Sequence, residues 1–417
     1  MKGISRFFTL YWIIYFPTCI AYNDLPGFSS IDEAMTVLLL IYTLWMYSHN
    51  RSINKRPWKE FAVCISLIVF YTVYSLLFGA NVSGAVWLDL MQEIRPYAII
   101  YCTWNLNPRF TKKQKKWMLG IMVITLFSWI VYHPQTLDTQ VETEFPVLGQ
   151  LAICTGMSWY LFTKKTKRNR NIALLLVLTG MLAPKFKFMG EVVCFIGFVY
   201  FVKNRLNFKS PKTIIYVVLL VTVILMVTWT RFDTYYVSGL SNDQLARPMT
   251  YKTSLQILRD YFPFGSGMGS FACNGAWKYY SPLYYEYHLN EVWGLSEGGG
   301  FICDAYYPTL AQFGIVGVFF FCWFWKRRLV AFNQIVDMRY YRVAMLTFCC
   351  LVIEQTADSS WLSGKGMGYC MLIALCLNAN RNMMEQRRRE EMRKEMMEKR
   401  RMAANSENEQ LKLAEKI

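Results

Sequence analysis

The sequence YFPFGSGMGSF at residues 261–271 lies inside the one long polar stretch of this chain, residues 231–300. A hydrophobic run, FICDAYYPTLAQFGIVGVFFF at residues 301–321, closes that stretch. On both sides the sequence passes from one apolar run to the next, as expected for helices that cross a lipid bilayer. We therefore predict an all-α polytopic membrane protein whose helices carry one large external loop.

The composition agrees with a chain surrounded largely by lipid. Hydrophobic residues make up 54% of the sequence and charged residues only 18%. The net charge of +17 is distributed in short clusters between apolar runs, so we predict a lipid bilayer and no nucleic acid as partner. Most cysteines lie inside apolar runs without metal-site spacing. Cys273 and Cys303 are predicted to lie outside, where a disulfide is permitted, but their pairing stays open.

Twelve segments are long and apolar enough to be candidate membrane spans. The seventh and eighth are short, and the fourth contains Asp89, Glu93 and Arg95. The candidates are residues 7–22, 32–48, 60–79, 84–104, 116–132, 145–162, 171–184, 188–202, 213–230, 301–325, 342–357 and 367–380.

The distribution of lysine and arginine predicts the orientation of these segments. Basic clusters occupy every second connection, including residues 109–116, 164–170 and 326–328, and such connections face the cytoplasm. Neutral or acidic connections such as residues 133–144 are expected outside. Both termini are then cytoplasmic and the large loop is external, so we expect a multi-pass membrane protein. The first segment lacks a small-residue cleavage site and is expected to be retained.

These features divide the chain into four parts. Residues 1–230 hold nine predicted spans, residues 231–300 form the external loop, residues 301–380 hold three more spans, and residues 381–417 form a charged cytoplasmic tail. Glu390 and Lys394 have the spacing that supports an exposed helix. Anionic lipid heads are an alternative partner for the basic tail.

Ionisable residues inside or beside the spans are candidates for function, because burying charge in a bilayer is costly. Arg95 lies in the fourth span, and Lys185 and Lys187 lie between the seventh and eighth. Lys187 and Glu191 are spaced for a structural ion pair on one helix face, which stays an alternative. Three further residues are predicted to line the outer ends of the last two spans: Glu354, Asp358 and Lys365.

The external loop offers a second set of cations. Arg247 precedes Pro248, which favours a helix start, and the helix is predicted to run to about residue 262 along the membrane surface. Arg247, Lys252 and Arg259 would be cationic donors on this helix, and guanidinium groups bind phosphate through two nitrogens. Non-specific contact with lipid phosphates remains the alternative.

Two further features of the loop allow a structural interpretation. GSGMG at residues 265–269 lacks a preceding strand and a Lys-Ser/Thr pair, so we interpret it as a glycine turn and not as a nucleotide loop. His288 is the one histidine of the loop and a minor candidate for a catalytic base.

Three stretches together resemble the bacterial O-antigen ligases and O-antigen polymerases. In that family an external arginine opens a short helix that ends in a Pro-Gly-rich turn, as Arg247 and YFPFGSGMGSF do here. The next span begins at a polar step and continues through Gly-x-x-Gly, similar to CDAYYPTLAQFGIVG, which ends at Gly314 and Gly317. PKFKFMG at residues 184–190 lies where the family has a basic residue, often in a Ser-Arg pair.

The chain departs from the ligases at one important place. Counting back from Gly314, Cys303 stands where ligases usually have histidine, and Asp304 stands where they have asparagine. The absence of that histidine mildly favours the polymerase branch.

The resemblance implies an activity. The protein would transfer a glycan from an undecaprenyl-diphosphate carrier to an acceptor hydroxyl, on another lipid-linked glycan or on lipid A core, without metal, nucleotide sugar or other cofactor. A chain-length regulator would be a possible partner. Arg247 would stabilise the departing diphosphate, and Asp304 would be the base with His288 in reserve. The implied diphosphate-binding set is Arg247, Lys252, Arg259, Lys185, Lys187 and Arg95. Tyrosines between residues 279 and 287 would stack on sugars or form an interfacial belt.

Two other classes remain. A flippase for lipid-linked glycans also suits twelve spans, although no internal repeat and one dominant loop count against it. An assembly subunit without catalysis is the third possibility, and it predicts that Arg247 tolerates substitution.

Overall fold

The computed structural model describes residues 2–24, 30–49, 55–132, 146–182 and 185–414. Within these ranges the chain is helical and contains no strand, which confirms the predicted all-α class. The first half forms α1 (Lys2–Asp24), α2 (Ile31–His49), α3 (Lys55–Phe78), α4 (Ser83–Leu106), α5 (Lys112–Tyr132), α6 (Pro146–Phe162), α7 (Lys167–Leu178), α8 (Phe186–Ile196) and α9 (Pro211–Phe232). The second half forms α10 (Ala246–Asp260), α11 (Asn274–Lys278), α12 (Leu283–Glu286), α13 (Tyr306–Thr309), α14 (Gly314–Asn333), α15 (Met338–Glu354) and α16 (Met367–Ala414).

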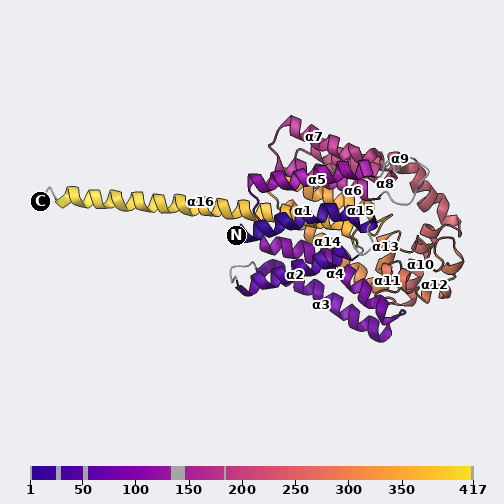
Figure 1. Cartoon of the computed structure of the whole chain (residues 1–417). Helices are drawn as coiled ribbons and strands as arrows, with labels where there is room; N and C mark the ends of the chain where they lie inside the picture. Colours follow the sequence, from indigo (N-terminus) through magenta and orange to yellow (C-terminus); the bar gives the residue numbers. More distant parts are fainter. Residues whose placement is uncertain (1, 25–29, 50–54, 133–145, 183–184, 415–417) are drawn as a thin grey trace.

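The long helices form a bundle, and the loop helices gather at one end of it. Figure 1 shows α10 to α13 at the end opposite to the N-terminus and to the projecting part of α16. Within the bundle, α4 packs against α2, α3 and α16, α1 packs against α5, and α15 packs against α8 and α16. Packing between distant parts of the chain therefore joins the ends of α8, α15 and α16 beneath the loop.

In the described part of the chain, three helical stretches are long and apolar enough to cross a membrane, namely Pro57–Phe78, Pro211–Val237 and Tyr306–Asn333. Val147–Phe162 is a shorter apolar helix. The twelve-span count is not confirmed, although each candidate segment contains helix in its described part. Several of the other candidate segments contain charged residues. For example, α4 contains buried Asp89, Glu93 and Arg95.

The tenth predicted span begins later than expected. Residues 301–305 are not helical, and a short helix over Tyr306–Thr309 precedes the long α14. Gly314 has a positive φ of 59° at this junction, a backbone conformation that side chains disfavour. The break places Asp304 before the long apolar helical stretch begins, in continuity with the loop predicted to be external.

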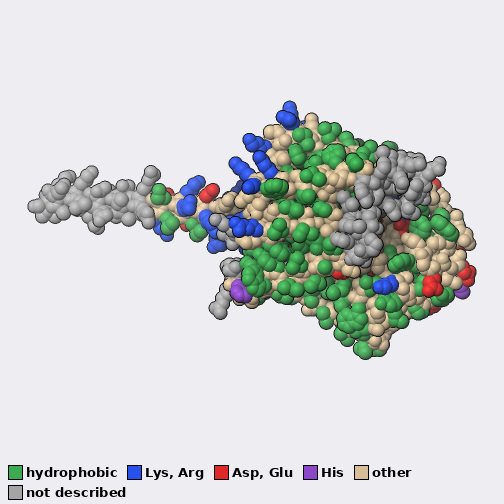
Figure 2. Space-filling model, viewed as in Figure 1, with side chains coloured by type: hydrophobic (Ala, Val, Ile, Leu, Met, Phe, Trp, Pro, Cys, Tyr) green, Lys and Arg blue, Asp and Glu red, His purple; other side chains and the backbone are tan. Residues whose placement is uncertain are grey.

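Basic and acidic side chains gather at opposite ends of the surface. Figure 2 shows lysine and arginine side chains gathered where α16 leaves the bundle, hydrophobic side chains over its middle, and acidic side chains toward the loop. This arrangement agrees with the basic connections lying together at one end. The predicted outer connection at residues 133–144 and the end of the seventh candidate span, at residues 183–184, lie outside the described residues.

The loop of residues 231–300, predicted to be external, is a folded unit with a core of its own, and not only a surface helix. Ile257 of α10 is fully buried beside residues from the whole loop. Its fully buried apolar partners are Phe271, Ala272, Ala276, Leu283, Tyr284, Leu289, Leu295 and Ile302. At roughly 1.5–3 kcal/mol for each large apolar side chain, this core stabilises one fixed loop conformation over the bundle.

The C-terminal tail continues the last bundle helix without a break. α16 runs for 48 residues from Met367 to Ala414, which confirms the predicted helical tail. Its described side chains beyond residue 386 are exposed, as expected for a helix with charges on all sides. Near the bundle, Arg381 pairs with Glu385 at 3.0 Å, and Arg109 pairs with the same carboxylate at 3.2 Å.

Candidate functional site

The glycine turn fastens the loop to the bundle. Gly265, Gly267 and Gly269 all have positive φ, between 76° and 91°, which confirms the predicted tight turn. The amide of Gly269 donates to the Asp89 carboxylate of α4 at 3.0 Å, and Gln312 donates to the same oxygen at 2.6 Å. A buried carboxylate in an apolar span thus serves as an anchor for the loop, a role that the sequence did not reveal.

The same turn makes close backbone contacts that only glycine permits. A Cβ on Gly269 would lie 2.6 Å from the carbonyl group of Ala85, and a Cβ on Gly267 would lie 2.8 Å from Gly79 Cα. Tyr74 also donates its hydroxyl to the carbonyl of Gly265 at 2.9 Å. The turn therefore sets the height and orientation of α10 above α3 and α4.

The chain between α15 and α16 forms the centre of the site. The amide of Tyr306 donates to the carbonyl of Gln355 at 3.1 Å. The hydroxyls of Tyr236 and Tyr251 both donate to the carbonyl of Thr356, at 2.6 Å and 3.0 Å. Two parts of the loop, and the short helix that follows it, therefore attach to one turn of the bundle.

Around this turn lies a group of charged residues that we name the ion-pair cluster. Its cations come from the start of α8 and the residue before it, from α10, and from the segment before α16. Its carboxylates come from the residues before α13, from the end of α15 and from the turn that follows α15. The cluster consists of Lys185, Lys187, Arg247, Asp304, Glu354, Asp358 and Lys365. It contains four cations and three carboxylates, and thus one formal positive charge in excess.

Arg247 and Asp304 form the outer ion pair of the cluster. Arg247 Nε and Nη2 both donate to Asp304 Oδ2, at 2.8 Å and 2.5 Å. The guanidinium group also lies over the ring of Tyr235, 4.3 Å from its centroid. Burial raises the pKa of Asp304, and Arg247 opposes that rise. The side chains remain 14% and 23% exposed, so both are accessible from the surface.

Lys187 forms the inner ion pairs of the cluster. It donates to Glu354 at 2.6 Å and to Asp358 at 2.8 Å. Burial disfavours the ammonium charge, but the two carboxylates outweigh it and hold the pKa of Lys187 above its ordinary value. The alternative pairing of Lys187 with Glu191 is wrong, because Glu191 accepts from Tyr369 at 3.4 Å and the acids of α15 are better placed.

Lys185 and Lys365 complete the cluster. Lys365 lies 3.6 Å from Asp358. Among the seven members of the cluster, Lys185 alone has no ion-pair partner in the described part of the chain. Burial lowers the pKa of Lys185, and the neighbouring charge of Lys187 lowers it further. Lys185 is therefore the cation whose charge is least compensated, which suits it to receive an anion.

Four residues predicted to join this site lie elsewhere. Lys252 pairs with Asp243 at 2.8 Å, and Arg259 is 78% exposed beside Asp260. A helix turns about 100° per residue, so Lys252 and Arg259 lie on one face of α10 and Arg247 on another. His288 is 80% exposed and lies 3.7 Å from Glu291.

Arg95 is the fourth residue, and it is buried in a separate network. Its guanidinium group lies 2.7 Å from Asp32 and 2.6 Å from Glu33, and it also donates to the carbonyl of Leu362. Two carboxylates already compensate its charge. Arg95 therefore ties α2 and α4 to the segment before α16, which is a structural task.

The remaining sequence-based hypotheses for the loop have mixed outcomes. Tyr284 is fully buried and cannot stack on a sugar, whereas Tyr279 and Tyr285 are 42% and 55% exposed. Cys273 and Cys303 are both free thiols. No group of three or more metal-ligating side chains was found among the described residues.

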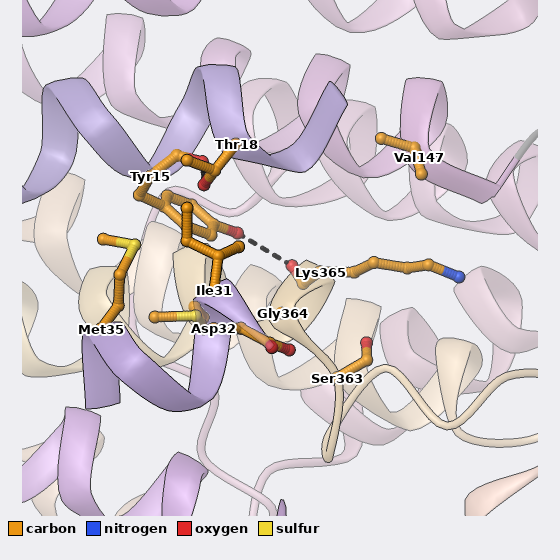
Figure 3. Close-up of a pocket in the computed structure, with 10 residues that line it drawn as sticks. Tyr15, Thr18, Ile31, Asp32, Met35, Val147, Ser363, Gly364 and Lys365 are labelled. Carbon is orange, nitrogen blue, oxygen red and sulfur yellow. Dashed lines mark hydrogen bonds between the residues drawn. The ribbon is translucent and has the colours of Figure 1, made fainter. Parts of the chain in front are cut away.

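A hollow lies beside the cluster, between α1, α2, α6 and the segment before α16 (Figure 3). It encloses about 390 Å³, including space open to solvent. The hydroxyl of Tyr15 donates to the carbonyl of Lys365 at 3.1 Å across it, and Figure 3 shows the Lys365 side chain extending away from Tyr15. Its walls include the apolar Ile31, Met35 and Val147 together with the charged Asp32 and Lys365.

No family model matches the chain, and no curated protein matches it.

Proposed function

We propose that this protein is a membrane glycosyltransferase that moves a glycan from an undecaprenyl-diphosphate carrier to an acceptor hydroxyl during surface polysaccharide assembly. The proposal covers the polymerase and the ligase reaction. It places the protein in a bacterial inner membrane with both termini in the cytoplasm. The observation that carries it is the contact between Arg247 and Asp304 beside Lys185, at the loop end of a bundle with membrane-length helices.

The chemistry of such a transfer needs a cation and a base close together. The acceptor oxygen forms a bond to the anomeric carbon of the donor sugar, while the bond from that carbon to the diphosphate oxygen breaks. The electron pair of the broken bond leaves with the lipid diphosphate. The acceptor proton passes to a base. Fixed cations accelerate this step because negative charge develops on the leaving group.

The ion-pair cluster supplies groups for each of these tasks. Arg247 and Lys185 would hold the diphosphate, with Lys365 at the edge of the neighbouring hollow. Asp304 would take the acceptor proton, because it is a surface-accessible carboxylate in contact with the proposed diphosphate-binding arginine. Lys187 would hold the site together, since both of its carboxylate partners come from the α15 end of the bundle.

Membrane placement supports the same interpretation. The cluster lies where α8 begins and α15 ends, beside the loop helices, and in the proposed orientation amphiphilic donors would present their head groups at this level. Cations at this position would meet the diphosphate of a lipid whose chain stays in the bilayer.

The deciding experiment uses cells that lack this gene, complemented with wild type or with Arg247→Ala. A gel of surface glycolipids reports the result. A ladder collapsed to one repeat unit would indicate a polymerase, and loss of all capped core would indicate a ligase. Normal ladders in cells that express Arg247→Ala at wild-type level would overturn the proposal. Flipping of a labelled lipid carrier by the purified protein in vesicles would then favour a transporter.

A further inference from the structure

The contact between Arg247 and Asp304 has a consequence for the order of events at the site. Two nitrogens of the guanidinium group, Nε and Nη2, are bound by a single carboxylate oxygen. This edge of the guanidinium group is the one that binds phosphate through two parallel hydrogen bonds. The phosphate of a ligand and the carboxylate of Asp304 therefore compete for the same donors.

The other surfaces of Arg247 leave little room for a different arrangement. One face of the guanidinium group is covered by the ring of Tyr235 at 4.3 Å. The side chain as a whole is only 14% exposed. A phosphate that binds Arg247 side-on, through Nε and Nη2, must therefore take the edge now occupied by Asp304.

Opening of this contact is expected to involve the Asp304 side chain and not the surrounding backbone. The backbone beside it is attached to α15 by the bond from the Tyr306 amide to the Gln355 carbonyl. Rotation of the Asp304 side chain is therefore the expected movement. Loss of the guanidinium contact also removes an influence that lowers the pKa of Asp304. The released carboxylate is then a stronger base.

We propose that the Arg247–Asp304 ion pair is a latch that the diphosphate of the donor opens, which frees Asp304 to accept the acceptor proton only after the donor is bound. This inference rests on the proposed function for its second half. In the closed state the cation and the base neutralise each other, so neither acts on water or on an acceptor alone. Binding of the donor exchanges carboxylate for phosphate at Arg247 and creates both working groups in one step.

The latch is tested by whether loss of the Asp304 charge strengthens or weakens the binding of a diphosphate. Purified wild type and Asp304→Asn are titrated with farnesyl diphosphate in detergent, without an acceptor. A latch predicts that Asp304→Asn binds the diphosphate more tightly, by about threefold or more, because a competing charge is gone. The same variant is expected to lose glycan transfer. Farnesol, which has the same tail without phosphate, measures the contribution of the chain alone.

Asp243→Asn is the matched control, because Asp243 pairs with Lys252 at 2.8 Å in the same loop but is 73% exposed. The affinity of Asp243→Asn for farnesyl diphosphate is expected to equal that of wild type. Weaker or unchanged affinity in Asp304→Asn would overturn the latch and assign a structural role to the pair. If Asp304→Asn does not fold, Asp304→Ser removes the same charge, and the latch again predicts tighter binding of the diphosphate than in wild type.

The result separates the latch from the proposed function. Tighter binding by Asp304→Asn, together with a wild-type protein that transfers no glycan, would retain the latch and reject the function. Glycan transfer by wild type, together with unchanged or weaker binding in Asp304→Asn, would retain the function and reject the latch.

Discussion

Lys187 at the beginning of α8 donates to Glu354 at the end of α15 over 2.6 Å, and this contact joins residues 167 positions apart in the chain. Lys187 also donates to Asp358 at 2.8 Å, and all three side chains are largely buried. The ammonium group therefore compensates two carboxylates that would otherwise face each other in a poorly solvated place. Lys187 and Lys185 are only two positions apart, but Lys187 is held in ion pairs, whereas Lys185 is free of them in the described part of the chain.

Lys187→Ala is expected to destabilise the protein by about 3–5 kcal/mol, because it leaves buried carboxylates uncompensated. Lys185→Ala, which removes an unpaired cation two positions away, is expected to change stability far less. Thermal unfolding of both variants in one detergent measures the difference. Equal melting temperatures for the two variants would show that the inner ion pairs do not stabilise the fold.

The two arginines of α10 are expected to behave differently. Arg247 contacts Asp304 and Tyr235, whereas Arg259 is 78% exposed beside Asp260. Arg247→Ala should reduce glycan transfer by about a hundredfold or more, which is the effect of removing one donor to developing charge. Arg259→Ala should retain activity close to wild type. A comparable loss in both variants would assign diphosphate binding to the whole helix and not to the cluster.

The pH dependence of transfer should have two limbs with opposite causes. Asp304 must be ionised to act as a base, and activity is lost as pH falls through its folded pKa. Burial raises that pKa, so the acidic limb should lie above the ordinary range of an aspartate. Lys185 must be protonated to bind phosphate, and burial lowers its pKa, so the alkaline limb should lie below the ordinary range of a lysine.

Lys185→Arg tests the alkaline limb, since a guanidinium group does not titrate in this range. The variant is expected to keep its activity to higher pH while the acidic limb stays in place. Rate profiles of wild type and variant, measured across the same buffers, provide the comparison. An unmoved alkaline limb would assign it to another group.

Three glycines test separately whether the loop needs a positive φ or close packing at a glycine position. Gly269 combines a φ of 76° with a Cβ position only 2.6 Å from Ala85. Gly298 has a φ of 75° but nothing within 4 Å of its Cβ position, and Gly300 has open space without that constraint. Gly269→Ala should displace the loop from α4 and abolish transfer. Gly298→Ala should cost only about 1–2 kcal/mol of local strain, and Gly300→Ala should be neutral.

Limited proteolysis of the loop, run beside a transfer assay, measures this series. Faster cleavage in Gly269→Ala than in Gly298→Ala would show that close packing on α4, and not backbone conformation alone, holds the loop. Equal cleavage rates would contradict that interpretation.

Local sequence determined the helices, the position of the loop and its glycine turn. Apolar runs of about 20 residues favour helix in a bilayer, Pro248 suits the first turn of α10, and three glycines permit the positive φ values at residues 265–269. These features depend on residues close together in the chain. The helix of the tail and the all-α class were predictable for the same reason.

Only the tertiary structure decided which charges meet. Arg247 and Asp304 are 57 positions apart, and the partners of Lys187 lie at the end of α15 and just beyond it, more than 160 positions away. Asp89 became an anchor of the loop because packing of α4 brought it to Gly269. Spacing along one helix placed Lys252 and Arg259 away from the cluster, although residue type alone grouped them with Arg247. A charged side chain acts through neighbours that the packing of distant helices supplies, and no local pattern in the sequence specifies them.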